Sequence, residues 1–300
     1  MGLLPRRWLI VPLILFVVSP PALAQTVDIP ARTDNNLIVA VYNIQWLGQK
    51  EHELGKLADV IEHFDVTGIV EVKKEDAVAK LVAELETKTG KDWGYTYGVR
   101  THRPYGTYHE AYAAVWRTDR VTLEGLVGGV WDRHEAFRND PYIVSFRRKA
   151  FDFSMILVHT RWTDDRDGSR ASEVLELGEQ VKWLREFLPE KDILVAGDFN
   201  YPGTKSVMKK FAATGGLLQV DANPKTTFKS NNTDYANPYD HIYISEGHTS
   251  EYVAGSAVAI DTTQIIYGDN SQLNMATSKK ELSDHLPVIA VFDVSGQDDD

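Results

Sequence analysis

Short apolar runs recur along this chain, and each ends in or close to an acid, an amide or an imidazole. The runs are LIVAVYN (37–43), VTGIVEV (66–72), FDFSMILVH (151–159), DILVAGDFN (192–200) and LPVIAVFDV (286–294). Runs this short, with almost no polar face, are typical of strands buried on both sides. A chain with this pattern must pair its strands into sheets and cover both faces of each sheet.

Stretches with a helical spacing of apolar residues separate some of these strands. Helices are expected over residues 51–64, 76–89 and 169–188, and further strands over 95–99, 111–116, 121–127, 142–146, 241–245 and 251–260. The 300 residues fit one large domain or two small ones, and no internal repeat or clear linker divides them. Strands that alternate with helices in both halves predict an α/β fold, in which two packed sheets are covered outside by helices.

The first 24 residues have the parts of a secretory signal peptide. Two arginines (residues 6–7) precede an apolar stretch (8–18), and a small-x-small triplet ends at Ala24. We therefore expect cleavage after Ala24 and export of the mature chain. An uncleaved anchor is disfavoured because Pro12 interrupts an apolar stretch already shorter than the roughly 20 residues of a spanning helix. Twin-arginine export is disfavoured because the rest of its motif is missing.

The mature chain is then one domain over residues 25–294, followed by a disordered acidic tail over 295–300. It has no cysteine, so an exported chain of this kind depends on its core and on any bound ions rather than on disulfides. Chemistry that needs a reactive thiol is also excluded.

Charge restricts the classes of function. Removal of the two signal arginines, with no acid lost, changes the formal net charge from −11 to −13. Such a protein repels a polyanion at long range, which argues against a passive nucleic-acid coat protein. An enzyme whose acids are neutralised by a divalent metal remains open. Basic residues in VRTHR (99–103), WRTDR (116–120) and FRRK (146–149) could contact phosphates or belong to ordinary strand ends and turns.

The polar residues at the strand ends are the candidate functional residues. They are Asn43, Glu71, His159, Asp198, Asn200, Asp284 and His285. Taken singly, each could form a turn or cap a loop. Because strand ends lie at the rim of a sheet on a rigid backbone, however, the set can converge on one site.

The chemistry of this set favours a hard divalent cation and proton transfer. Its carboxylates and amides offer oxygen ligands, and no cysteine competes, which suits Mg²⁺, Ca²⁺ or Mn²⁺. The two histidines can transfer protons or donate hydrogen bonds to a phosphate, each with a carboxylate that fixes its tautomer. Hydrolysis of a phosphodiester needs these components.

Seven segments of the chain occur in the order expected of the endonuclease/exonuclease/phosphatase superfamily, which the chain resembles from about Leu37 to Val294. They are YNIQWLG, VEV, TYHEAYAAVWR, VHTRW, AGDFN, YDHIYI and SDHLPV. The chain is most similar to the pancreatic-type deoxyribonucleases, because TYHEAYAAVWR carries their pattern of tyrosine, acid and tyrosine on a strand that ends in arginine. The resemblance implies a four-layer α/β/β/α sandwich, two packed mixed sheets flanked by helices, with the site at one end.

The resemblance also implies roles for individual residues. The catalytic residues would be His159, His285, Glu110, Asp240 and Asn200; the metal ligands Asn43, Glu71, Asp198 and Asp284; and the substrate contacts Tyr108, Arg138 and Asn200. Glu110 would pair with His159, and Asp240 with His285. The implied protein is a secreted monomer without stable membrane association. It would need Mg²⁺ or Mn²⁺, cut DNA with little sequence specificity and leave 5′-phosphates.

The chain departs from the family pattern in three ways. Val70 replaces the glutamine that usually precedes the glutamate, and His241 stands where an arginine commonly follows Asp240. The substitution at His241 could alter the contacts of Asp240. The disulfides of the secreted animal enzymes are missing, so a loop held by structural Ca²⁺ is plausible. Residues 223–234 (NPKTTFKSNNTD) are the candidate, with a plain polar turn as the alternative.

Other functions remain open on the sequence alone. The same fold and metal site could serve a sphingomyelinase or an inositol-phosphate phosphatase, or a nuclease-type toxin subunit. A repair nuclease for abasic sites is disfavoured because export removes it from the chromosome. A catalytically silent binding module would show no metal-dependent turnover, and the competent types of all the candidate residues disfavour it.

Overall fold

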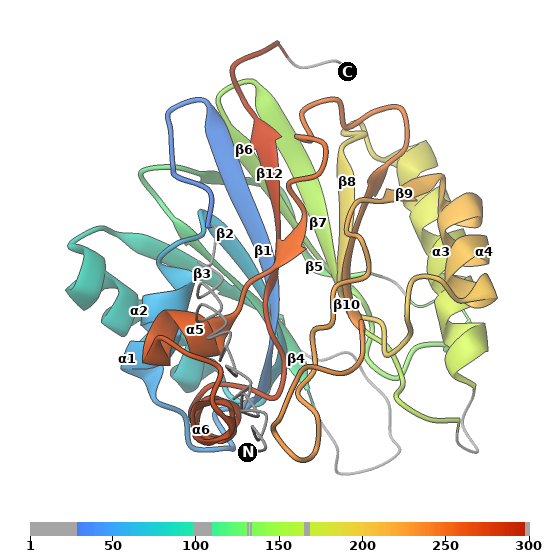
Figure 1. Cartoon of the computed structure of the whole chain (residues 1–300). Helices are drawn as coiled ribbons and strands as arrows, with labels where there is room; N and C mark the ends of the chain where they lie inside the picture. The colour runs from blue at the N-terminus through green and yellow to red at the C-terminus, as the bar shows by residue number, and fades with distance from the viewer. Residues whose placement is uncertain (1–28, 99–109, 131, 133, 165–168, 298–300) are drawn as a thin grey trace, which may run out of the picture.

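Two mixed sheets pack face to face, and helices cover the outer face of each (Figure 1). The computed structural model describes residues 29–98, 110–130, 132, 134–164 and 169–297; the predicted signal peptide and the last three residues of the tail lie outside these ranges. The predicted α/β sandwich is confirmed. No helix within the described ranges is long and apolar enough to cross a bilayer.

The two sheets have six strands each. The first sheet contains, in spatial order, β11 (Val258–Ala259), β12 (Val288–Asp293), β1 (Asn36–Leu47), β2 (Val66–Val72), β4 (Ala111–Arg117) and β3 (Trp93–Tyr97). The second sheet contains β5 (Thr122–Gly129), β6 (Tyr142–Arg148), β7 (Phe151–His159), β8 (Ile193–Asp198), β10 (Asp240–Ser245) and β9 (Leu217–Gln219). The helices are α1 (Leu54–Ile61), α2 (Glu75–Thr89), α3 (Arg170–Phe187), α4 (Ser206–Gly215), α5 (Thr262–Tyr267) and α6 (Gln272–Glu281).

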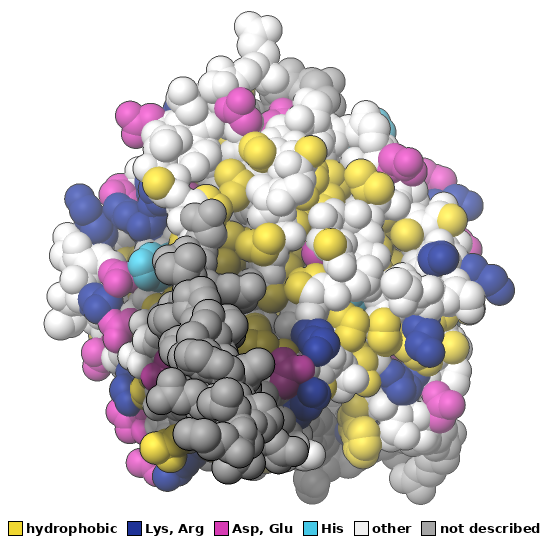
Figure 2. Space-filling model, in the orientation of Figure 1, with side chains coloured by type: hydrophobic (Ala, Val, Ile, Leu, Met, Phe, Trp, Pro, Cys, Tyr) yellow, Lys and Arg dark blue, Asp and Glu magenta, His cyan; other side chains and the backbone are white. Residues whose placement is uncertain are grey.

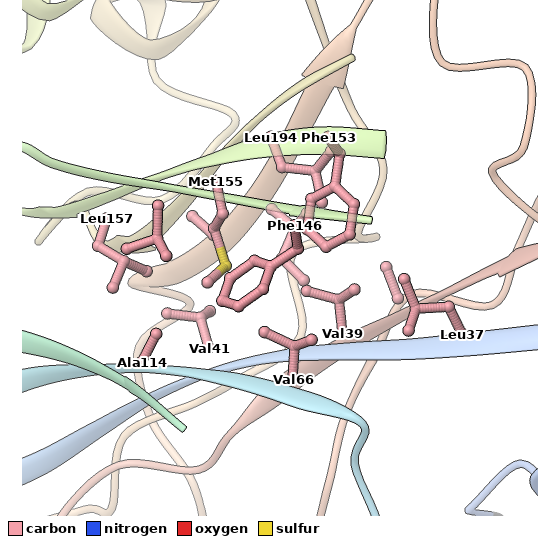
Figure 3. Close-up of a cluster of buried hydrophobic side chains, with 14 of the residues drawn as sticks. Leu37, Val39, Val41, Val66, Ala114, Phe146, Phe153, Met155, Leu157 and Leu194 are labelled. Carbon is pink, nitrogen blue, oxygen red and sulfur yellow. The ribbon is translucent and has the colours of Figure 1, made fainter. Parts of the chain in front are cut away.

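The apolar runs form strands because they are covered on both faces. In β1, Leu37, Val39 and Val41 point between the sheets, toward side chains of the second sheet such as Phe146 and Phe153 (Figure 3). The alternate residues of the same strand pack against α5 and the turn after α1 instead. Burial on both sides explains why the run has no polar face.

The helices cover the sheets through apolar stripes at helical spacing. Leu57 of α1 and Leu81 of α2 pack on the first sheet, and Val174 and Val181 of α3 pack on the second with α4. Figure 1 shows α1, α2 and α5 on one side of the molecule and α3 and α4 on the other. Helix α3 begins at the capping residue Ser169, whose side chain accepts the backbone N–H of Ser172.

The topology places the candidate residues at one end of the sandwich. Each sheet contains one parallel pair, β1 with β2 and β7 with β8, so the carboxyl ends of a pair lie side by side. Asn43 pairs in register with Val70, next to Glu71, and His159 pairs with Asp198. The antiparallel strands β12 and β10 begin where these pairs end.

One predicted strand is wrong. Of residues 251–260 only Val258–Ala259 forms a strand, β11. Gly255 has a φ of +78° in a turn, and Tyr252 makes one isolated bridge to Phe292, so the apolar residues of this segment cover the edge of the first sheet from a loop. Helices α4, α5 and α6 were not anticipated.

Candidate active site

Asn43 links the two sheets at the centre of the site. It lies in β1, and its Nδ2 donates to Glu71 Oε1 of the first sheet (2.9 Å) and to Asp198 Oδ2 of the second (3.1 Å). All three side chains are at least half-buried, and Asn43 is fully buried. The amide therefore holds two carboxylates close together between the sheets.

Backbone irregularity directs Glu71 into this centre. Glu71 has a φ of +62°, the left-handed region that costs a residue other than glycine roughly 1–3 kcal/mol. The pairing of β2 shifts register on both sides of it, between Asn43 and Leu47 on β1 and between Ile69 and Val72 on β2 itself. Strand alternation is thus interrupted at the residue whose carboxylate the site uses.

Two histidine–carboxylate pairs flank Asp198. His159 Nδ1 lies 2.7 Å from Glu110 Oε2, and His285 Nδ1 lies 2.7 Å from Asp240 Oδ2. The Nε2 atoms of both rings lie 3.7 Å from Asp198 Oδ2. The structure therefore brings together both pairs expected from the sequence and directs the Nε2 atoms toward one carboxylate.

The clustered charges shift the pKa values of these groups. Burial lowers the pKa of His159, but Glu110, Glu71 and Asp198 outweigh burial and raise that pKa to about 10. Burial also lowers the pKa of His285, but Asp240 and Asp198 outweigh burial and raise that pKa well above its usual value. Burial and the neighbouring Asp240 raise the pKa of Asp198 to about 6. The protein alone thus favours two imidazolium ions that balance the acids of the centre.

The centre fits a divalent cation. Asn43 Oδ1, Glu71 Oε2 and Asp240 Oδ1 are buried and have no hydrogen-bond partner among the described residues, which is costly unless a ligand satisfies them. Two groups could hold a metal ion, Glu71 with His159 and Asp198, and Asp198 with Asp240 and His285. Because both Nδ1 atoms already face carboxylates, the oxygens of Asn43, Glu71 and Asp198 are the better donors for a hard cation.

Asp284 lies outside both groups. Its Oδ2 accepts from Gln45 Nε2 (2.9 Å), and Gln45 Oε1 in turn accepts from Lys50 Nζ (2.7 Å). Asp284 lies in a bend just before His285, and its carboxylate bonds Gln45 while the His285 ring faces Asp240. The structure does not group this expected ligand with the other three, Asn43, Glu71 and Asp198.

Asn200 supports the centre from the second sheet. Its backbone N–H donates to Asp198 Oδ1 (2.8 Å), and its Nδ2 donates to the carbonyl oxygen of Thr160 (2.9 Å). Its φ of +52° is a conformation that asparagine tolerates. Asn200 therefore fixes the orientation of Asp198 and connects the ends of β7 and β8.

The two other expected substrate contacts differ in what the structure shows. Tyr108 lies outside the described residues. Arg138 is half-buried in the loop before β6, and its backbone N–H donates to Glu173 Oε1 (2.7 Å). The other oxygen of the buried Glu173 accepts from the Arg161 N–H (2.7 Å). One carboxylate thus joins the Arg138 loop to the segment after β7.

Three more residues lie around Glu110 and His159: Lys73 and Asn139, which sequence reasoning missed, and Tyr112, the second tyrosine of the tyrosine–acid–tyrosine pattern. Lys73 Nζ lies 3.1 Å from Glu110 Oε1, with both side chains nearly buried. Asn139 Nδ2 donates to Glu110 Oε2 (3.4 Å), and the Tyr112 hydroxyl accepts the His159 backbone N–H (3.0 Å). Lys73 comes two residues after Glu71, directly after the end of β2, and this spacing was the one available signal.

The structure accounts for His241 and for the candidate calcium loop. His241 does not contact Asp240: on the opposite face of β10, its Nδ1 lies 3.0 Å from Asp221 Oδ1, and its Nε2 lies 2.9 Å from the carbonyl oxygen of Tyr201. In the candidate calcium loop, Lys225 and Lys229 both bond Asp234 Oδ2, at 3.1 and 2.9 Å. Two ammonium groups on its carboxylate do not fit a Ca²⁺ site, so this loop is a polar turn.

Comparison with known proteins agrees with this geometry. Residues 40–285 match the endonuclease/exonuclease/phosphatase family. The chain is similar to a deoxyribonuclease of Thioalkalivibrio sp. (strain K90mix), with 28% identity over 284 residues that cover 91% of this chain and 75% of the relative. It is also similar to deoxyribonuclease-1 of Mus musculus, with 26% identity over 274 residues that cover 84% of this chain and 90% of the relative.

The fold has solved counterparts. A family protein from Leptotrichia buccalis C-1013-b superposes with a TM-score of 0.59 at 14% identity, covering 85% of this chain and 98% of that one. At this identity the likeness concerns the fold alone, whereas the sequence match spans most of the chain. The chain therefore belongs to the endonuclease/exonuclease/phosphatase family and is a hydrolase that acts on phosphate esters.

Proposed function

We propose that the mature chain is a secreted endonuclease that depends on a divalent metal and hydrolyses DNA phosphodiester bonds with little sequence specificity, leaving 5′-phosphate ends. The observation that carries this proposal is the pair of histidines whose Nε2 atoms lie at equal distances, 3.7 Å, from Asp198. The two deoxyribonucleases among its relatives support DNA as the substrate.

Two oriented histidines suit an in-line displacement at phosphorus. Attack by water needs a base that takes a proton, and the departing 3′-oxygen needs an acid that gives one. Glu110 and Asp240 hold the Nδ1 protons of His159 and His285, so each Nε2 can face the phosphate. A cation bound by the acids of the centre would offset the charge that holds both rings protonated, so that one ring could act neutral as the base and the other cationic as the acid. The P–O3′ bond breaks as the new P–O bond forms.

The acids of the centre prepare it for a cation. Asn43, Glu71 and Asp198 would hold Mg²⁺ or Mn²⁺, which would stabilise the negative charge that develops on the phosphate. The chain itself keeps these oxygens in place through the Asn43 amide and the Asn200 N–H. Phosphate positioning would come from residues such as Arg138 and Tyr108 without base readout, which gives low sequence specificity.

The proposal is tested on supercoiled plasmid. The purified mature chain should produce nicked and then linear DNA with Mg²⁺ and none after addition of a chelator. DNA ligase should reseal the nicks without prior kinase treatment, since the 5′ ends carry phosphate. Parallel incubations with sphingomyelin and with an inositol phosphate should show no turnover. Intact plasmid beside cleavage of either alternative substrate would contradict the proposal.

Export is proposed from the sequence. Paired arginines, an apolar stretch and the triplet ending at Ala24 support a cleaved signal. The mass of the protein recovered outside the cytoplasm should correspond to a chain that begins at Gln25. A recovered chain that retains residues 1–24, or one found only in the cytoplasm, would refute export by this route.

We propose that the mature chain is a monomer, which light scattering would check.

A further inference from the structure

Two exposed tryptophans lie just beyond site residues, Trp46 near the end of β1 and Trp162 after the end of β7. Trp46 is 40% exposed and Trp162 is 64% exposed. Trp46 is three residues after Asn43 in the first sheet, and Trp162 is three residues after His159 in the second. Three residues of chain span at most about 11 Å, so the backbone of each tryptophan lies within that distance of a residue of the centre, one on each sheet.

Both tryptophans are held by a fixed backbone. Trp46 has a φ of +54°, and its carbonyl oxygen accepts from the N–H groups of Gln49 (2.8 Å) and Lys50 (3.0 Å). The segment before Trp162 is anchored on both sides: the Thr160 N–H donates to the Asp198 carbonyl (3.0 Å), and the Arg161 N–H donates to buried Glu173 (2.7 Å). Each indole is thus presented at the rim from an ordered segment.

Exposure of these rings is unfavourable for folding alone. A large apolar surface left in water forgoes the stabilisation that burial would give, and a tryptophan in the left-handed region adds backbone strain. Exposed aromatic side chains beside a site are therefore candidates for contact with a ligand. A flat ring on a rigid backbone fits another flat ring, such as a nucleobase.

The negative net charge of this chain makes a stacking contact with a nucleobase more important for DNA binding than it is in a basic nuclease. The mature chain has a net charge of −13, from the −11 of the full chain without its two signal arginines. Figure 2 shows Lys and Arg side chains interspersed with Asp and Glu on the face it presents. Near the centre, Lys73 pairs with Glu110 and Arg161 with Glu173. Affinity for DNA therefore depends less on phosphate neutralisation than is usual.

We propose that Trp162 stacks on an unpaired base next to the scissile phosphate, with Trp46 as a second stacking contact across the centre, so that single-stranded DNA is bound in preference to duplex. This inference rests on the proposed nuclease function and specifies its substrate. Bases within a duplex already stack on each other, so only an unpaired or frayed base can pack on an indole. Stacking accepts any base, in agreement with low sequence specificity.

The test compares one mixed-sequence DNA as a single strand and as a duplex, in Mg²⁺, with Trp162→Ala, Trp46→Ala and the conservative Trp162→Phe. Trp162→Ala should raise KM for the single strand roughly 5- to 100-fold, the range of one base–aromatic stack, and leave kcat within about twofold. KM for the duplex should change less, Trp46→Ala should act in the same direction, and Trp162→Phe should restore most of the affinity.

Phe187→Ala is the matched control. Phe187 is as exposed as Trp162, at 66%, but it lies at the end of α3, next to the start of β8 rather than the end that carries Asp198. This variant should bind and cleave like the parent. In chelator, where no turnover occurs, a single-stranded oligonucleotide should quench tryptophan fluorescence of the parent, and Trp162→Phe should lose most of the quench.

The outcomes separate the two proposals. If the parent cleaves DNA but Trp162→Ala and Trp46→Ala keep parental KM for single strands, the stacking contact is refuted and the nuclease function stands. The same conclusion follows if Phe187→Ala raises KM as much as Trp162→Ala does. If the parent cleaves neither form of DNA, both proposals are refuted.

Discussion

Asp198 connects the two sheets through its hydrogen bonds. Asn43 of β1 donates to one carboxylate oxygen, and the backbone of Asn200 donates to the other. His159 and His285 both direct their Nε2 atoms to the oxygen that Asn43 contacts. A single residue at the end of β8 thus orients acids, amides and imidazoles that are far apart in the sequence.

The buried pair of Asp221 and His241 lies behind this centre, and its contribution to stability should depend on pH. Burial alone would raise the pKa of Asp221, but the bond and charge of His241 lower it below its usual value. Burial alone would lower the pKa of His241, but the bond to Asp221 raises it. The pair therefore stabilises the fold at intermediate pH and loses this stabilisation in acid and in base.

The direction of this pH dependence follows from the linkage between protonation and folding. Asp221 stabilises the fold above its unfolded pKa of about 4, and this is lost as pH falls through its lower folded pKa. His241 stabilises the fold below its unfolded pKa of about 6.5, and this is lost as pH rises through its higher folded pKa. Asp221→Asn should cost about 3 kcal/mol of unfolding free energy near pH 5.5 and less at alkaline pH. Urea unfolding across this range checks this; a cost independent of pH would contradict it.

Sequence patterns anticipated that most of the candidate residues would lie together, because the ends of parallel strand pairs converge. Asp284 is the exception: it bonds Gln45, whereas its neighbour His285 bonds Asp240. Sequence patterns missed Lys73 and Asn139, because their contacts to Glu110 depend on how loops fold against the strand ends. Residue type indicates which side chains can bind a metal or a phosphate, whereas the direction of each side chain depends on local backbone geometry.

Strand β8 has a close contact that protects the position of Asp198. Gly197 has a φ of +153°, and a Cβ there would lie 1.9 Å from the carbonyl oxygen of Val158 in β7. Only glycine allows the backbones of β7 and β8 to approach this closely. The residue next to it is Asp198, so a shift of the strand would move that carboxylate.

Gly197→Ala should therefore reduce both stability and activity. Gly128 of β5 is the matched control, because its φ of +157° is similar but a Cβ there would meet nothing within 4 Å. Both variants carry the backbone strain, and only Gly197→Ala adds the clash. We expect it to lose about 1–3 kcal/mol more unfolding free energy than Gly128→Ala and to cleave DNA more slowly. Equal unfolding midpoints would refute the steric account.

At the level of elements, prediction succeeded where both faces of a strand are apolar. The five opening runs all form strands, and the long helix over residues 169–188 is α3 with one residue removed at each end. Helix α6 was missed because only Met275 and Ser278 of its ten residues are buried, so its sequence carries no apolar stripe. The segment 251–260 resembles a strand in composition, but it turns at Gly255 and pairs only through Val258–Ala259 and one bridge at Tyr252.

In the whole molecule, the packing of the two sheets completes the candidate site, because each sheet supplies only part of it. Asn43 and Glu71 come from the first sheet, and His159 and Asp198 from the second. Neither sheet alone supplies both histidines of the site. The sequence indicates the strands, and the resemblance to a family implied the four-layer sandwich, but the spatial order of the strands comes from the structure.

The net charge predicts how salt affects the enzyme. Because the mature chain and DNA are both anionic, added salt screens their long-range repulsion while it weakens local phosphate contacts. These effects oppose each other, so log(kcat/KM) should fall with log[NaCl] with a slope shallower than about −2, the value for roughly two neutralised phosphates. Cleavage assays between 50 and 500 mM NaCl measure it; a steep slope would show that basic contacts dominate.

The central claim is that His159 and His285 transfer the protons of phosphodiester hydrolysis. The most direct measurement is the initial rate of plasmid nicking at saturating Mg²⁺ by His159→Ala and by His285→Ala. His248→Ala is the control, since His248 lies in the turn after β10, at the other end of that strand from Asp240. Each catalytic variant should lose about 10²–10⁴-fold in rate, and the control should retain the parental rate. If either catalytic variant nicks DNA as fast as the parent, the acid–base account is contradicted.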